Sequence, residues 1–151
     1  MITVFWNSEE FLLVEALDDN MKFNEDYFIN KILEKIILKT FEDREQLQKK
    51  LILHYDNARP HISKRVSQYL SDHKIIKAPQ PPYSPDIAPS DFYLFGYLKQ
   101  QLQGCEFGSK EELLQTVTQI IEEIPIDTLN KVFTEWERRL CEVIQSNGDY
   151  I

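Results

Sequence analysis

Residues 51–61, LILHYDNARPH, decide the fold of this chain together with residues 81–91, PPYSPDIAPSD. The first stretch opens with a short apolar run, typical of a buried strand, and continues through Asp56 into a proline that suits the first turn of a helix. The second is a proline-rich loop that ends in Ser90, a suitable helix N-cap, with Asp91 in the first helical turn. The sequence therefore predicts one carboxylate where a strand ends and another where a helix begins.

These two carboxylates are candidate ligands of a divalent cation. Carboxylates at element ends of one small domain can converge on Mg²⁺ or Mn²⁺, because these ions prefer hard oxygen ligands. Each residue also has an ordinary interpretation, since Asp56 can simply form a turn and Asp91 can interact with the helix dipole. Spacing alone favours the ordinary interpretation for each residue taken singly.

The same residues match a known family. Residues 56–61 and 81–95 resemble the catalytic core of mariner-type transposases, in the wider Tc1/mariner group of DDE/DDD transposases. This resemblance implies an RNase H-like fold that cuts and rejoins DNA with three carboxylates and two metal ions, Mg²⁺ or Mn²⁺. It makes Asp56 the second catalytic acid and Asp91 the third, both as metal ligands, with the 34-residue separation of the mariner branch. Asp86 belongs to the family signature but is not a ligand there.

The resemblance runs almost from end to end. Residues 4–15 resemble the family's Trp-containing strand pair, and residues 136–141 and 147–150 resemble its closing segment. In the family the first catalytic acid lies on a strand upstream of the Trp-containing segment, and no residue here matches it. The family's N-terminal helix-turn-helix modules have no counterpart either. We therefore expect a single partial catalytic domain over residues 1–151. Its fold is α/β, an RNase H-like mixed sheet with flanking helices and a C-terminal helical part, lacking the family's first, central strand.

The unmatched acid leaves three hypotheses for function. In the first, the chain is a remnant of a transposase catalytic domain, inactive unless another chain or a longer form supplies the acid. In the second, it is a non-catalytic module that binds DNA or a protein partner. In the third, it is an unselected relic. The resemblance implies DNA as the partner, transposon ends in the family, and a nuclear location. Open strand edges would also allow a homodimer.

Length and composition indicate one globular domain. A chain of 151 residues that is 42% hydrophobic can bury an independent core and is unlike disordered sequences. No apolar run is long enough for a bilayer and no signal peptide is recognisable, so we expect a soluble intracellular protein without a membrane partner. No small-molecule cofactor is expected. We interpret Cys105 and Cys141 as reduced thiols and expect Cys141 to pack in the core.

The net charge of −8 is unusual for a DNA enzyme, because phosphate affinity comes from Lys and Arg. Residues 49–77 nevertheless hold seven basic and two acidic side chains. This basic segment is either a phosphate-facing surface or an ordinary solvated face, and both interpretations stay open. The candidate DNA contacts within it are Arg59, Lys64 and Arg65.

Apolar periodicity predicts the elements in order. A β-hairpin is followed by a helix capped by Asn24, and then by a strand, a crossover helix and a second, parallel strand. This unit would place Asp56 at the carboxyl end of its strand, where ligands collect in open α/β sheets. A helix after Ser90, with Phe92 and Phe95 in its packing, precedes a helix with a capping box at Ser109. The predicted ranges are 2–6 and 11–17 for the hairpin, 50–55 and 75–79 for the parallel strands, and 25 onward, 60–72, 90–103, 110–124 and 127–145 for the helices.

The three histidines do not have the spacing of a helix-borne zinc site. His61 lies five residues after Asp56 and could reach the site or a phosphate. We expect it instead to make a structural hydrogen bond from the turn.

Overall fold

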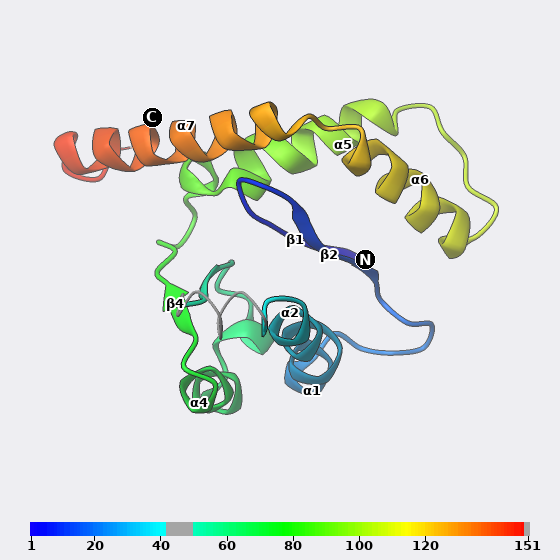
Figure 1. Ribbon diagram of the computed structural model, residues 1–151, viewed down its shortest axis with the longest axis horizontal. Helices are drawn as coiled ribbons and strands as arrows, with labels where there is room; N and C mark the ends of the chain where they lie inside the picture. Colours follow the sequence, from blue (N-terminus) through cyan, green and yellow to red (C-terminus); the bar gives the residue numbers. More distant parts are fainter. Residues whose placement is uncertain (42–49, 150–151) are drawn as a thin grey trace. The chain divides into compact units, whose positions relative to one another are not determined.

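A computed structural model describes residues 1–41 and 50–149 of the chain (Figure 1). The closing segment of the sequence analysis runs to Tyr150, which lies outside the described residues. By its internal contacts the chain divides into two compact units. The hairpin unit comprises residues 1–16 and 83–151, and the Asp56 unit comprises residues 17–82.

The hairpin unit begins with two antiparallel strands, β1 (Ile2–Trp6) and β2 (Phe11–Ala16). The side chain of Asn7 accepts hydrogen bonds from the backbone N–H groups of Glu9 and Glu10, at 2.7 and 2.8 Å. This closes the four-residue connection as an Asx turn, which is the usual role of Asn after a strand. The predicted hairpin is confirmed, with its second strand ending one residue early.

The other regular elements described in the hairpin unit are helical. A short 3₁₀ turn, η3 (Pro85–Ile87), leads into the π-helical turn η4 (Ser90–Leu94), which continues as α5 (Phe95–Gln101). Two longer helices follow, α6 (Lys110–Glu122) and α7 (Ile126–Gln145). Figure 1 shows the hairpin running beside α5 and α6, and the apolar side chains between these elements form the core of the unit. The buried members of this core are Leu94, Leu98, Val117, Ile121, Ile124 and Leu129.

Local sequence signals set the ends of these helices. The Ser109 hydroxyl accepts from the N–H of Glu112 at 3.1 Å, while the Glu112 carboxylate accepts from the N–H of Gly108 at 2.8 Å. The predicted capping box is therefore present, although its reciprocal bond reaches one residue further back. Gly104 has a φ of +78° just after α5, a conformation that favours glycine. Pro125 separates α6 from α7.

Three predictions in this unit are wrong. Ser90 is not an N-cap, because the helical hydrogen bonds start earlier: the N–H groups of Asp91 and Phe92 both donate to Ala88, and the cap position is a proline. Phe95 is 46% exposed rather than packed, since the core face follows Leu94 and Leu98. Cys141 is also exposed; both cysteines are free thiols, as predicted.

The Asp56 unit begins with one continuous helical segment. It comprises α1 (Glu25–Tyr27), the π-helical stretch η1 (Phe28–Leu33) and α2 (Glu34–Lys39). The predicted cap is confirmed, because the Asn24 side chain accepts from the N–H of Tyr27 at 2.9 Å. The segment buries its predicted apolar face, including Phe28, Ile32, Leu33 and Ile36.

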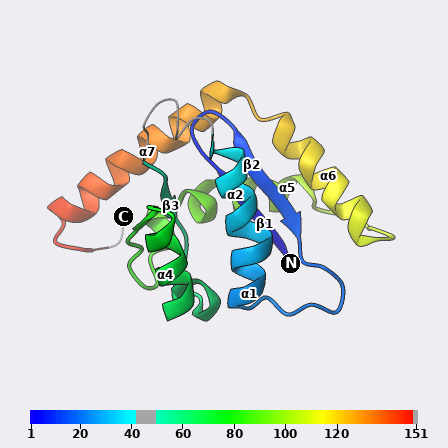
Figure 2. The same ribbon diagram turned by 60° about the horizontal axis from the view of Figure 1, so that its bottom comes forward.

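A parallel strand pair completes this unit. It consists of β3 (Ile52–His54) and β4 (Ile76–Ala78), joined through the 3₁₀ turn η2 (Arg59–Ile62) and α4 (Lys64–Asp72). Figure 2 labels β3 and α4. The predicted strand, helix and strand unit is confirmed, but α4 starts later than expected because Ser63 caps it through the N–H of Val66. Ile62 therefore precedes the helix and is 50% exposed, whereas Val66 and Leu70 are buried as predicted.

The architecture is therefore the predicted mixed α/β class. Its described strands form two separate two-stranded ladders, one antiparallel and one parallel. Within residues 1–41 and 50–149, none of the helices has both the length and the apolar character needed to cross a bilayer.

Candidate functional site

Asp56 follows β3 closely and occupies the predicted position at the carboxyl end of that strand. Its side chain is 70% exposed. Oδ1 accepts a hydrogen bond from the N–H of Ala58 at 3.1 Å and lies 2.5 Å from Nδ1 of His61. The hydrogen bond from the Ala58 N–H to the Asp56 side chain forms an Asx turn, which redirects the chain from the strand into η2. Both bonds reach the same carboxylate oxygen.

His61 is held by an aromatic pocket within the Asp56 unit. Its ring centroid lies 4.4 Å from that of Phe28, 5.4 Å from that of Phe23 and 5.3 Å from that of Tyr55. The His61 side chain is only 15% exposed. With its ring fixed in this way, Nδ1–H is the donor toward the Asp56 carboxylate. The predicted structural hydrogen bond from the turn is present, and its acceptor is the candidate metal ligand.

Lys77 on β4 adds a cation close to Asp56 that the candidate contacts from the sequence did not include. Its ammonium lies 3.3 Å from Oδ1 of Asn57 and 4.8 Å from the centroid of the Tyr55 ring. Burial lowers the pKa of Lys77, and the charge of Asp56 opposes this shift. In the sequence, Lys77 was recognisable only as a member of the basic segment. The pairing of β4 with β3 brings it near Asp56.

Two further contacts stabilise the turn after β3, and both involve Gln80. The Asn57 side-chain amide donates to the carbonyl of Gln80 at 2.6 Å, and Nε2 of His54 lies 2.6 Å from Oε1 of Gln80.

The Tyr55 side chain lies against Phe28, and burial raises the pKa of Tyr55 to about 12. Tyr55 is therefore a neutral packing residue at physiological pH.

The three candidate DNA contacts follow Asp56 on η2 and α4. Arg59 and Lys64 are exposed. Arg65 is also exposed, but its guanidinium forms an ion pair with Asp26 of α1. Exposed ion pairs are worth little, so this contact does not prevent Arg65 from exchanging its partner.

Asp91 lies in the first turn of η4 within the hairpin unit, as predicted, and is exposed. The backbone around it is held by side chains from distant elements. The indole N–H of Trp6 donates to the Ser90 hydroxyl at 3.2 Å. Ahead of Asp91, the carbonyls of Asp86 and Ile87 accept from two side chains of α7.

Each carboxylate is thus placed within its own unit. Asp56 belongs to one unit and Asp91 to the other, so their convergence on a single cation stays a prediction. Among residues 1–41 and 50–149, no group of three or more His, Cys, Asp or Glu side chains has the arrangement of a metal site.

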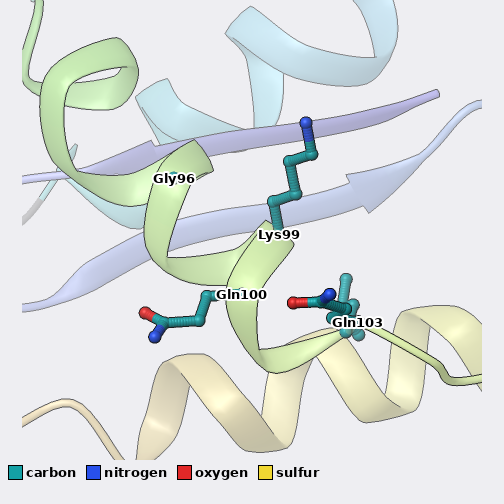
Figure 3. Close-up of a pocket in the computed structure, with 5 residues that line it drawn as sticks. Gly96, Lys99, Gln100 and Gln103 are labelled. Carbon is teal, nitrogen blue, oxygen red and sulfur yellow. The ribbon is translucent and has the colours of Figure 1, made fainter.

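An open hollow of about 610 Å³ lies along α5 and the residues just after it. Its lining consists of Gly96, Lys99, Gln100, Leu102 and Gln103. Figure 3 shows Lys99 and Gln100 pointing in different directions from the helix. Because its polar groups do not converge, this hollow lacks the features of a small-molecule site.

Comparison with known protein families finds no family model that matches the chain. Two curated relatives do match it. The chain is 27% identical over 158 residues to histone-lysine N-methyltransferase SETMAR of Homo sapiens, an alignment covering 99% of the chain and 22% of the relative. It is 24% identical over 157 residues to the mariner Mos1 transposase of Drosophila mauritiana, covering 100% of the chain and 44% of the relative. The chain therefore spans less than half the length of either relative.

Solved structures of Mos1 match over 99% of the chain. The Mos1 catalytic domain superposes with a TM-score of 0.90 at 21% identity, covering 74% of that structure. The Mos1 catalytic domain with Raltegravir and Mg gives the same score and identity, with 76% of that structure covered. The Mos1 paired-end complex with Mn gives 0.89 at 22% identity, with 44% covered. The chain is thus homologous to SETMAR and to the Mos1 mariner transposase, and its fold matches the Mos1 catalytic domain.

Proposed function

We propose that this chain is a remnant of the catalytic domain of a mariner-type transposase, a family whose chemistry is metal-dependent cleavage and joining of DNA strands. One observation carries the proposal: the two aspartates that match the family's acids are both exposed and lie at the ends of their elements, in a fold that matches Mos1.

Asp56 and Asp91 would hold the cation. Their donor set fits Mg²⁺ or Mn²⁺, because both residues offer hard carboxylate oxygens. At Asp56 the described hydrogen bonds both use Oδ1, which suits ligation through Oδ2 of the exposed side chain. Mos1 structures with Mn and with Mg support this choice of ion. The bound ions would activate the attacking oxygen and stabilise the leaving one.

DNA would bind to the surface formed by η2 and α4, the elements that follow Asp56 in the chain. Arg59 and Lys64 are exposed there, and Arg65 is available by exchange of its exposed ion pair. The supporting comparison is with Mos1 structures that are described as paired-end and strand-transfer complexes. With a net charge of −8, the chain should bind DNA weakly and with strong salt dependence. The same proposal makes transposon-like ends the DNA partner, a homodimer the assembly and the nucleus the location of the chain.

We further infer that the chain is inactive by itself. Only two acids match the family pattern, and a cation held by two carboxylates lacks the bridging anionic group that a two-metal reaction needs. Activity would require the unmatched first acid to come from another chain or from a longer form of this protein.

Titration with Mn²⁺ tests the proposal, with the free ion measured by electron paramagnetic resonance. We expect the wild-type chain to bind Mn²⁺, and both Asp56→Asn and Asp91→Asn to weaken binding about tenfold or more. Asp72→Asn is the matched control, because Asp72 is an exposed residue at the end of α4 that bonds to Gln68. Equal binding by all four proteins would contradict the proposed site.

A nicking assay with Mn²⁺ and supercoiled DNA tests the inferred inactivity. Robust cleavage that disappears in Asp56→Asn would disprove it and leave the chemistry in place. DNA binding without any Mn²⁺ binding would instead support the second candidate, a non-catalytic DNA-binding module. The exposed Arg59 and Lys64 favour that alternative.

A further inference from the structure

Two prolines lie in the backbone segment immediately before Asp91. Pro85 and Pro89 lack an N–H group, and η3 is a single 3₁₀ turn. Tyr83, at the start of this segment, has a φ of +57° and is 89% exposed. Side chains of α7 make hydrogen bonds to this segment.

Arg139 of α7 makes two contacts that flank Asp91 and a third within its own helix. Its Nη1 donates to the carbonyl of Asp86 at 2.9 Å, and its guanidinium lies 4.4 Å from the centroid of the Phe92 ring. Its Nε donates to Glu135 at 2.9 Å, which orients the guanidinium from its own helix. Arg139 therefore connects the segment before Asp91 with the residue directly after it.

Trp136 makes a second connection from the preceding turn of α7. Its indole N–H donates to the carbonyl of Ile87 at 2.8 Å. Its ring meets Phe133 edge-on at 5.8 Å, and Phe133 meets Trp6 edge-on at 5.1 Å. Trp6 in turn bonds to Ser90, the residue directly before Asp91.

We propose that Arg139 and Trp136 are positioning residues for Asp91. They hold two consecutive carbonyls before it and one aromatic ring after it, so the turn that carries the carboxylate has a fixed position relative to α7. The role of Asp91 as a metal ligand rests on the proposed function above, but the positioning of its backbone does not.

Arg138 offers a matched control for Arg139. It is the neighbouring arginine on the same helix and also bonds to Glu135, at 2.6 and 2.7 Å. Its other partner is Glu142, and all of its described contacts stay within α7. Substitution of either arginine removes one positive charge from α7, whereas only Arg139 reaches the segment around Asp91.

Amide hydrogen exchange in the wild-type chain and in Arg138→Gln, Arg139→Gln and Trp136→Phe tests the positioning directly. The N–H groups of Asp91 and Phe92 both donate to Ala88, at 2.8 and 3.0 Å, and report on the turn. We expect exchange at these two amides to rise about tenfold in Arg139→Gln and Trp136→Phe, the effect of losing one good hydrogen bond to the carbonyls. Arg138→Gln should match the wild type.

Amides of α6 serve as the internal reference. This helix packs in the core of the hairpin unit, and none of the described interactions joins it to Arg138 or Arg139. If exchange in α6 rises as much as at Asp91, the variant has lost global stability and local positioning is rejected. If Arg139→Gln and Arg138→Gln give the same exchange at Asp91, the proposal is also overturned.

Mn²⁺ titration of the same variants separates the two proposals. We expect Arg139→Gln to weaken Mn²⁺ binding severalfold and Arg139→Lys, which keeps a donor without the planar fork, to restore part of it. A wild-type chain that does not bind Mn²⁺ would refute the metal site, and hydrogen exchange would still decide the positioning. Wild-type binding that Arg139→Gln leaves unchanged would refute the link between positioning and ligation.

Discussion

His61 places its Nδ1 2.5 Å from Oδ1 of Asp56, across the turn that leads out of β3. The imidazole is enclosed by Phe23, Phe28 and Tyr55, while the carboxylate that it holds is mostly exposed. A rigid, partly buried donor is thus coupled to a solvent-facing acid. The orientation of Asp56 is consequently coupled to the aromatic side chains that surround His61.

Substitution of His61 separates packing from hydrogen bonding. We expect His61→Phe, which keeps an aromatic ring, to lower the free energy of unfolding by about 1 kcal/mol, the value of one hydrogen bond. We expect His61→Ala to lower it by about 3 kcal/mol, because a cavity also opens beside Phe28. Urea denaturation measures both. A His61→Phe variant as stable as the wild type would show that the bond to Asp56 contributes nothing to stability.

Glu135 should make the stability of α7 pH-dependent. Hydrogen bonds from Arg138, and then from Arg139, lower the pKa of Glu135 from 4.5 to about 2. Because the folded pKa is below the ordinary value, the ionised carboxylate stabilises the fold above about pH 4.5, and this contribution is lost as pH falls toward 2. We expect Glu135→Gln to lower the Tm at neutral pH and the difference from wild type to shrink in that acidic window. A constant difference across the window would contradict the lowered pKa.

The basic residues after Asp56 should contribute to DNA affinity through phosphate contacts. We expect Arg59→Gln and Lys64→Gln each to weaken binding to any DNA sequence and to reduce the slope of log K against log salt by about 1. Lys99→Gln, an exposed cation on α5, is the control. Fluorescence anisotropy over a range of salt concentrations provides the measurement. Equal slopes for all three variants would remove Arg59 and Lys64 from the DNA-binding surface.

Two glycines should respond in opposite ways to the same substitution. Gly104 has a φ of +78°, so Gly104→Ala should destabilise the chain by about 1 kcal/mol. Gly96 lies inside α5 with open space where a Cβ would lie, so Gly96→Ala should stabilise it by up to about 1 kcal/mol. Thermal denaturation of the two variants compares them. Loss of stability in Gly96→Ala would mean that α5 is constrained by something other than its own propensity.

Sequence patterns predicted the features that depend on neighbouring residues. Alternation and turn chemistry located the hairpin around Asn7, and side-chain oxygens at Asn24 and Ser109 located two helix starts. Helical spacing also identified most of the buried side chains of α6 and α7, such as Val117 and Leu129.

The errors occurred where distant contacts or unusual turns decide the outcome. Ser90 is a residue type that often caps helices, but its hydroxyl accepts a hydrogen bond from the indole of Trp6, which is 84 residues away. Phe95 follows a π-helical turn, and 3.6-residue spacing cannot locate the buried face after such a turn. Lys77 approaches Asp56 through strand pairing, and Arg139 approaches the segment before Asp91 from α7; neither contact leaves a local sequence pattern.

The π-helical turn η4 has a consequence for how this chain tolerates change. A wider turn spreads its residues differently around the axis than an α-turn does, so the direction of Asp91 relative to the buried Leu94 depends on the turn type. A one-residue deletion between them that restored ordinary α-helix would keep both side chains and redirect the acid. The geometry of this aspartate is therefore encoded partly in segment length, which a comparison of residue identities alone would overlook.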